Sequence, residues 1–246
     1  IINKKNMFKN SNGTYKAYIK NFLGTPNNLV NRQLWLKKTL LNVPKGNRIL
    51  DAGAGEQQYK QYCSHLNYVS QDFNEYDGVG DNEGLQTGKW DISKTDIISD
   101  IVEIPEKDAS FDTIICTEVF EHIPDPIAAL DELYRLLRPG GELILTAPFA
   151  SLTHFAPFHY CTGFSKYWYE YHLPKTGFTI TEITPNGDYS AILAQELVRM
   201  TTYYGKAPFF IKVFTAFILR YIKSRKDQKS NAALGPFGYH VIAQKK

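Results

Sequence analysis

The stretch RILDAGAGEQQY, residues 48–59, decides the fold of this chain. Apolar residues that are typical of the end of a buried strand lead into Asp51 and then into two closely spaced glycines. Gly53 and Gly55 allow a sharp backbone turn, and they let a ligand approach where a Cβ atom would otherwise stand. The stretch therefore predicts a turn from a strand into a helix, built to hold a ligand.

The composition indicates a globular protein with a substantial core. The chain has 246 residues, of which 43% are hydrophobic, enough for one large domain or two small ones. A net charge of +3 lacks the basic excess of a nucleic-acid binder. The three cysteines show no CxxC spacing, so they favour neither a disulfide framework nor a zinc site and fit a reducing compartment. Without a signal-peptide pattern or a long apolar run, we expect a cytoplasmic protein.

Short apolar runs alternate with helix-like segments along most of the chain. The segment DPIAALDELYRLLRPGG, residues 125–141, has a proline near its start, a leucine stripe, and glycines at its end, which are helix start and stop signals. The predicted strands are residues 48–53, 68–73, 97–101, 113–117, 143–147, 178–185 and 238–244. This alternation predicts an α/β fold, a doubly wound and mostly parallel sheet that binds ligands beyond the carboxyl ends of its strands.

The first turn could serve a dinucleotide, but the match is incomplete. The GxGxxG pattern of nicotinamide-dependent oxidoreductases needs a small residue where Gln58 stands. The Asp51 carboxylate would repel a pyrophosphate, and would better suit a ligand with an ammonium group or several hydroxyls. Asp72, at the end of the second predicted strand, is placed to accept hydrogen bonds from a ribose, although it could also be a simple strand-end cap. A nicotinamide oxidoreductase is therefore a disfavoured alternative.

Three motifs together resemble those of the class I S-adenosylmethionine-dependent methyltransferases that act on small molecules. They are DAGAG at residues 51–55, SFDTIICTEVFEHIPDP at 110–126 and LRPGGELILTAP at 137–148. The resemblance is good over residues 48–149 and implies a Rossmann-like, seven-stranded sheet. In this family the last strand is antiparallel and lies between the fifth and sixth, a place that the C-terminal GYHVIAQ would fit.

The resemblance also implies the residues that bind S-adenosylmethionine. The methionine part would lie against the first turn, and backbone N–H groups at a helix start would meet its carboxylate while Asp51 balances its ammonium group. Gln57 stands where the family often has a third glycine. The implied cofactor residues are Asp51, Ala52, Gly53, Ala54 and Gly55 for methionine, Asp72 and Phe73 for ribose, Asp100 and Ile101 for adenine, and Glu118 and Val119 beside the fourth strand.

Methyl transfer to a hydroxyl is helped by a general base with a pKa near neutrality, which favours histidine. His122 follows the fourth predicted strand, and His154 and His159 follow the fifth, where a parallel sheet presents its loops to a ligand. His122 could equally be a structural hydrogen-bonding residue. No metal-ligand spacing links His154, His159 and Cys161, so we expect no metal.

The chain is expected to be a single methyltransferase domain over residues 1–246. Residues 1–45 would form an N-terminal helical cap, and residues 150–177 and 188–230 would form lid or insert helices on the substrate side. Within the last of these, residues 208–229 combine an aromatic stripe with many basic residues. This segment could cap the sheet, form a homodimer surface or lie on an anionic membrane.

The sequence thus predicts an S-adenosylmethionine-dependent methyltransferase that acts on a small molecule, with the hydroxyl of a sugar or metabolite as acceptor and no nucleic-acid partner. A non-catalytic cofactor-binding or membrane-associated protein on the same fold is the alternative that the sequence leaves open. Such a protein would keep Asp51 and Asp72 but would show no turnover.

Overall fold

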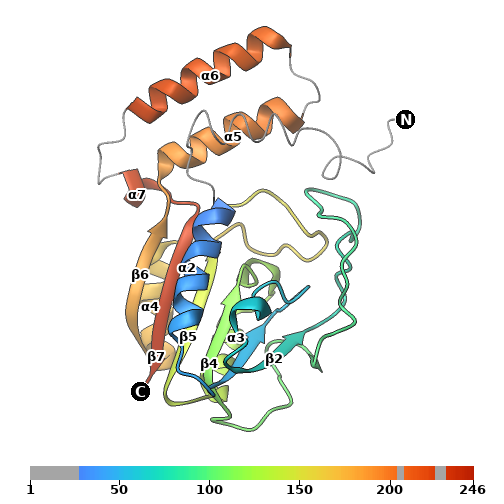
Figure 1. Ribbon diagram of the computed structural model, residues 1–246, viewed down its shortest axis with the longest axis vertical. Helices are drawn as coiled ribbons and strands as arrows, with labels where there is room; N and C mark the ends of the chain where they lie inside the picture. Colours follow the sequence, from blue (N-terminus) through green and yellow to red (C-terminus); the bar gives the residue numbers. More distant parts are fainter. Residues whose placement is uncertain (1–27, 204–207, 225–230) are drawn as a thin grey trace.

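The computed structural model describes residues 28–203, 208–224 and 231–246, and it contains the expected seven-stranded sheet (Figure 1). The strand order is β3-β2-β1-β4-β5-β7-β6. Strands β1 to β5 run parallel, whereas β7 is antiparallel to both β5 and β6, which confirms the predicted place of the C-terminal strand. The bounds are β1 Arg48–Ala52, β2 Asn67–Asp72, β3 Ile97–Ile98, β4 Phe111–Thr117, β5 Leu137–Pro148, β6 Phe178–Asn186 and β7 Gly238–Lys245.

Helices cover both faces of the sheet. The helix α2 (Asn28–Asn42) buries Leu36 and Leu40 in a core that includes Ile115 of β4. On the opposite face, α3 (Pro126–Leu136) and α4 (Lys166–Thr176) pack into a second core with Ile114 of β4. Neighbouring residues of one strand thus belong to different cores, because side chains alternate between the two faces of a strand.

The helix predicted before the fifth strand is confirmed, with sharper ends than its sequence signals gave. The Asp125 side chain accepts hydrogen bonds from the N–H groups of Ile127 and Ala128, so it caps a helix that begins at Pro126. The next residue after the helix, Leu137, already belongs to β5, which is therefore longer than the predicted strand at 143–147.

Two local expectations are wrong. The strand predicted at 97–101 is only the two residues of β3, since the chain turns away at Ser99. The first glycine turn leads into turns and the three-residue 3₁₀-helix η2 (Lys60–Tyr62), with no α-helix. Gln57 has a positive φ of 55°, which an α-helix does not tolerate, so the expected helix N-terminus does not form there.

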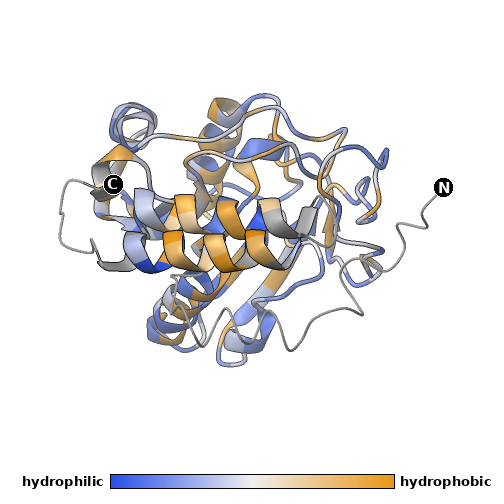
Figure 2. Cartoon of the chain, turned by 90° about the horizontal axis from the view of Figure 1, so that it is seen from above, coloured by the Kyte–Doolittle hydropathy of each residue, from blue (hydrophilic) through white to orange (hydrophobic). Residues whose placement is uncertain are grey.

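The C-terminal helices form a layer above the carboxyl ends of the strands (Figure 1). They are α5 (Tyr189–Tyr203), α6 (Phe209–Ser224) and the short α7 (Asn231–Leu234). Leu219 of α6 packs against Ala194 of α5. Seen from above, hydrophobic residues recur along this helix pair (Figure 2). None of the helices in the described ranges is long and apolar enough to cross a membrane.

The two segments expected to form lid helices differ in what they do. Residues 150–164 form a loop at the carboxyl ends of the strands, whereas α4 covers a face of the sheet and buries Tyr169 and Leu173 completely. The helical part of 150–177 is thus a core element. Of the expected cap at 1–45, residues 1–27 lie outside the described residues, as do 204–207 and 225–230 of the C-terminal insert.

Candidate active site

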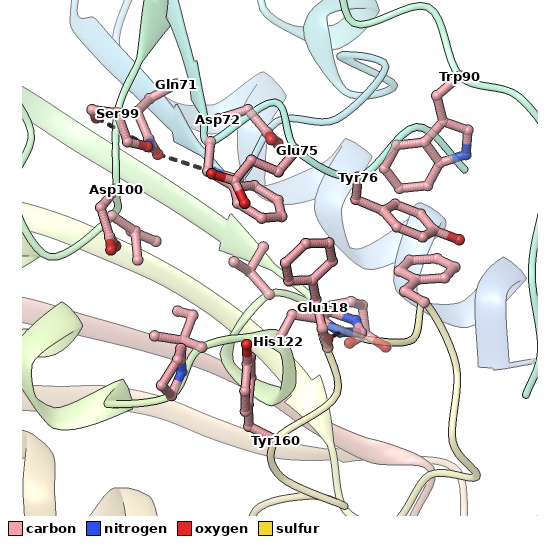
Figure 3. A pocket seen from close by; sticks show the side chains of 18 residues that line it. Gln71, Asp72, Glu75, Tyr76, Trp90, Ser99, Asp100, Glu118, His122 and Tyr160 are labelled. Carbon is pink, nitrogen blue, oxygen red and sulfur yellow. Dashed lines mark hydrogen bonds between the residues drawn. The ribbon is translucent and has the colours of Figure 1, made fainter. Parts of the chain in front are cut away.

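A cavity of about 450 Å³ opens at the carboxyl ends of β1, β2 and β4. Tyr76 and Trp90 stand on one side of it and Asp100 on the other (Figure 3). Seven of the residues expected to bind the cofactor line this cavity: Gly53, Asp72, Phe73, Asp100, Ile101, Glu118 and Val119. The structure thus brings the ends of three strands around one space, as a doubly wound sheet predicts.

The glycine at position 53 is required by its surroundings. Its φ is +73°, and its N–H group donates a 2.9 Å hydrogen bond to the Gln71 carbonyl. A Cβ atom at this position would lie 2.5 Å from a methyl carbon of Val119. Glycine therefore allows both the left-handed turn and the close approach of Val119 to the floor of the cavity.

Asp72 closes β2 and is held in place by two backbone groups. Its Oδ2 accepts from the Gly55 N–H at 2.8 Å, and its Oδ1 accepts from the Asn74 N–H at 3.0 Å. Because an ionised carboxylate has about four acceptor positions, these bonds leave capacity for two hydroxyl groups from the cavity.

Asp51 lies beneath the first turn and is closed off from the cavity. Its side chain is buried, and its Oδ2 accepts a 2.6 Å hydrogen bond from the Tyr68 hydroxyl. Burial raises the pKa of Asp51 to about 7, with a smaller contribution from the Asp72 charge, while the Tyr68 hydrogen bond opposes the shift. Ala52, Ala54 and Gly55 likewise do not line the cavity.

Glu118 follows β4 with a φ of 55°, an uncommon conformation for a residue other than glycine. Its Oε1 accepts from the Thr146 hydroxyl at 3.0 Å, and its Oε2 lies 2.6 Å from Arg32 Nη1. Burial lowers the pKa of Arg32, but Glu118, Tyr59 and Glu121 together outweigh this, and the pKa is raised overall. Sequence reasoning missed Arg32, because nothing in the pattern of α2 shows which strand end it faces.

Aromatic residues outside the predicted cofactor-binding set wall the cavity. Tyr76 stacks on Phe155 with ring centroids 4.8 Å apart, and Trp90 meets both rings edge to face. These rings join two loops that follow β2 and β5. The loops also pair through their backbones, since the Leu85 N–H donates to Thr153 and the Phe155 N–H donates to Leu85.

A second cavity of about 440 Å³ adjoins the first, and Glu118 and Phe155 line both. Its walls come from the start of α2, the two loops and the α5 helix. Polar side chains are frequent around it: Asn28, Gln86, Thr87, Ser151, Gln195, Glu196 and Arg199. The structure therefore offers two adjacent compartments that meet at Glu118 and Phe155.

The three predicted histidines lie together beside this junction. The ring centroids of His122 and His154 are 4.7 Å apart, and those of His154 and His159 are 4.9 Å apart. Burial lowers the pKa of His122 to about 3, so its imidazole is neutral. Burial also lowers the pKa of His159. Burial opposes the charged form of His154 too, but Glu121, the Leu152 carbonyl and Glu118 together outweigh it and raise the pKa of His154.

A protein-family model described as a methyltransferase domain matches residues 29–198. The chain belongs to this methyltransferase family. The match includes nearly all of α2, the strand ends beside the first cavity and most of α5, so most of the site lies inside the region that defines the family. The resemblance to class I S-adenosylmethionine-dependent methyltransferases is thereby confirmed.

Curated relatives of this methyltransferase align over part of their length. A ubiquinone biosynthesis O-methyltransferase of Xylella fastidiosa (strain M23) is 32% identical over 41% of this chain and 42% of its own. A demethylmenaquinone methyltransferase of Clavibacter sepedonicus is 32% identical over 47% of each chain. The aligned region thus spans less than half of each relative.

A solved S-adenosylmethionine-dependent methyltransferase from Archaeoglobus fulgidus has the same fold. Its structure covers 94% of this chain, and the chain covers all of it, with a TM-score of 0.54 and 18% identity. This likeness extends beyond the aligned region of the curated relatives and supports the Rossmann-like sheet as the framework of the whole chain.

Proposed function

We propose that this methyltransferase transfers a methyl group from S-adenosylmethionine to a hydroxyl oxygen of a small molecule. The observation that carries the proposal is the pair of adjoining cavities, which meet at Glu118 and Phe155. A two-substrate transfer needs a donor compartment and an acceptor compartment that open to each other, so that the reacting atoms can be aligned.

The first cavity fits the cofactor. Gly53 and Val119 line this cavity side by side, and the backbone of Gly53 would offer a surface against which the methionine part can lie. Asp72 has free acceptor capacity for the ribose hydroxyls, and Asp100 with Ile101 would bound the adenine. Asp51 does not line the cavity. It would therefore interact with the ammonium group only indirectly, through the Tyr68 hydroxyl or through the backbone of the first turn.

The second cavity would hold the acceptor. S-adenosylmethionine supplies a methyl group on a sulfonium that is already a strong leaving group, so the protein's contribution is alignment and exclusion of water. The histidines beside the junction would orient the acceptor hydroxyl and take its proton. His154 lines the second cavity and is better placed for this role than His122, whose low pKa makes it a weak base. The ring of His159 neighbours that of His154.

A hydroxyl acceptor is supported by two features. The printed name of the Xylella relative is that of an O-methyltransferase. The polar side chains around the second cavity, among them Gln86, Ser151 and Gln195, could bind a molecule with several hydroxyls, such as a sugar or a polar metabolite. We keep the sugar or metabolite hydroxyl as the proposed acceptor class.

Calorimetry with S-adenosylmethionine tests the donor site. The parent protein should bind it, and Asp72→Ala should weaken binding by at least ten-fold because the ribose loses its acceptors. The matched control is Asp81→Ala, since Asp81 also accepts a backbone N–H two residues on, from Glu83, but lies on an exposed loop. Equal affinity of parent and Asp72→Ala would remove Asp72 from the site, and no binding by the parent would overturn the proposal.

We further propose that the outer face of α6 rests on an anionic membrane. Phe210 and Phe217 are each 68% exposed, Phe214 and Tyr221 are also exposed, and Arg220 accompanies them. The sequence around the helix carries Lys206, Lys212, Arg220, Lys223, Arg225, Lys226 and Lys229 against the single acid Asp227. Exposed aromatics beside a basic excess suit a bilayer interface with anionic head groups.

Liposome sedimentation tests this surface. Binding should require anionic lipid and should fall as the salt concentration rises. It should drop several-fold in the double variant Phe214→Ser/Phe217→Ser. The control variant Leu29→Ser, at an exposed position of α2, should bind like the parent. Binding that ignores lipid charge and salt would overturn the proposal. So would a concentration-dependent dimer that the double variant dissociates, because the face would then be a homodimer surface.

A further inference from the structure

The side chain of Glu121 lies in an unusual position for a carboxylate. It belongs to the 3₁₀-helix η3 (Phe120–His122), is 1% exposed, and has no hydrogen-bond partner for either oxygen among residues 28–203, 208–224 and 231–246. A buried charge without a partner is costly, and proteins normally pair it or bind a metal ion to it. Among the described residues, the groups nearest to this carboxylate that can carry a positive charge are the imidazoles of His122 and His154, and neither reaches hydrogen-bond distance.

Two imidazoles face this carboxylate with their lone pairs. His122 Nδ1 lies 2.5 Å from the Phe158 carbonyl, and His154 Nδ1 lies 2.8 Å from the Leu152 carbonyl. A carbonyl only accepts, so each Nδ1 carries the hydrogen of the neutral ring, and each Nε2 is left with a lone pair. The carbonyls hold the rings as outer partners commonly hold metal-binding histidines.

The distances fit a shared cation better than a shared proton. His122 Nε2 and His154 Nε2 lie 3.7 Å and 3.6 Å from Glu121 Oε1, too far for a hydrogen bond. His122 Nε2 has no hydrogen-bond partner within the described residues. Ligand atoms at the usual distances of ~2.0–2.2 Å from a tetrahedral zinc ion stand about 3.4 Å apart, close to the two separations found here.

We propose that Glu121, His122 and His154 bind one divalent metal ion of the zinc type. One ligand atom from each residue lies within 4.8 Å of the others. Two imidazoles and one carboxylate favour zinc and similar transition metals over magnesium or calcium, which prefer oxygen ligands. No residue spacing along the chain predicts such a site, because His154 reaches the cluster from the loop after β5.

The position of the ion suggests what it does. Glu121 and His154 line the second cavity, and His122 lines the first, so the ion lies in the wall between them. A zinc-type ion would lower the pKa of a coordinated acceptor hydroxyl, so that its proton leaves to water and His154 is not needed as the base. The oxygen would then form its bond to the methyl carbon as the bond from that carbon to sulfur breaks. This role rests on the proposed function; the metal site itself does not.

Calorimetric titration of the full chain, first treated with a chelator, tests the site. ZnCl₂ should bind at one ion per chain with micromolar affinity or better, and MgCl₂ should bind at least ten-fold more weakly. Glu121→Gln, which keeps the shape of the side chain, and His154→Ala should each weaken zinc binding at least ten-fold. The control is His65→Ala, whose Nε2 faces the Val43 carbonyl away from the cluster, and which should bind like the parent.

Three results would overturn the proposal: no stoichiometric zinc uptake at 100 µM, parent-like zinc affinity in His154→Ala, or tighter binding of magnesium than of zinc. If Glu121→Gln fails to fold, His154→Ala still decides, because its side chain lies on a loop and is partly exposed. S-adenosylmethionine binding is measured on the same samples. If the parent binds S-adenosylmethionine but takes up no zinc, the metal site alone is overturned and the proposed function stands.

Discussion

Arg32 of α2 places its Nη1 atom 2.6 Å from Glu118 Oε2, at the point where the two cavities meet. Both side chains are largely buried, with 12% and 25% of their surface exposed. Removing one partner of a buried pair leaves the other charge unpaired, which costs about 3–5 kcal/mol when burial is complete. We expect Arg32→Met to lower the free energy of unfolding by about 2–3 kcal/mol, less than the full figure because Glu118 touches solvent.

A double-mutant cycle measures this pair directly. Urea unfolding of Arg32→Met, Glu118→Gln and the double variant should give a coupling free energy of about 1–3 kcal/mol. Arg138 provides a comparison, because its pair with Asp112 is half exposed, and the same cycle there should give less than about 1 kcal/mol. Strict additivity at Arg32 and Glu118 would show that the contact contributes nothing to the link between α2 and the sheet.

The turn at Gly53 gives a second prediction. Gly53→Ala should lower the free energy of unfolding by about 2–4 kcal/mol, since it adds a clash with Val119 to the strain of a positive φ. Gly140 has a similar φ of +78° but open space around it, so Gly140→Ala should cost only about 1 kcal/mol. Adding Val119→Ala to Gly53→Ala should restore part of the loss; equal costs at the two glycines would contradict the clash.

Tyr169 gives a prediction of the opposite sign. Its ring is completely buried, and its hydroxyl finds no hydrogen-bond partner in the described parts of the chain. Tyr169→Phe should therefore stabilise the protein by about 1 kcal/mol, which raises Tm by about 2–4 °C. Tyr68→Phe should instead destabilise it by about 1–3 kcal/mol, because the Tyr68 hydroxyl donates to Asp51. Thermal unfolding of both variants checks the pair, and a lower Tm in Tyr169→Phe would be contrary evidence.

The sequence predicted the sheet well because each strand contributes a short apolar run, and the run is a local property. The place of the antiparallel β7 came from the family resemblance, and so did the roles of Asp100 and Glu118, whereas Asp72 followed from its position at the end of a predicted strand. The places of Trp90, Phe155 and Arg32 around the site could not be predicted this way. They reach the site from two loops and a helix whose positions depend on tertiary packing, and no local period marks them.

The same limit explains the error at the first turn, and it explains why sequence spacing did not suggest the proposed metal site. The glycines predicted a helix start, but a positive φ at Gln57 breaks the helix, and single-residue backbone conformations are not visible in apolar patterning. His122 and His154 show no metal-like spacing along the chain, yet their Nε2 atoms face one carboxylate. Residue spacing along the sequence therefore says little about a site whose residues come from separate loops.

Asp51 should make the stability of the protein without cofactor fall as the pH rises. Its pKa is about 7 when folded and about 3.9 in an unfolded chain, so between these values the folded state binds more protons. Folding stability from this group is complete at acid pH and declines towards neutral pH. The loss approaches about 1.4 kcal/mol for each pH unit and levels off above the folded pKa.

Asp51→Asn removes this titration and keeps an acceptor for the Tyr68 hydroxyl. Urea unfolding at pH 5 and pH 8 should show that the parent loses about 2–3 kcal/mol relative to the variant, because subtraction cancels the groups that titrate in both proteins. Asp81→Asn, on an exposed loop, should follow the parent curve. Parallel curves for the parent and Asp51→Asn would mean that Asp51 is ionised at its ordinary pKa, and that burial beneath the first turn does not hold it protonated.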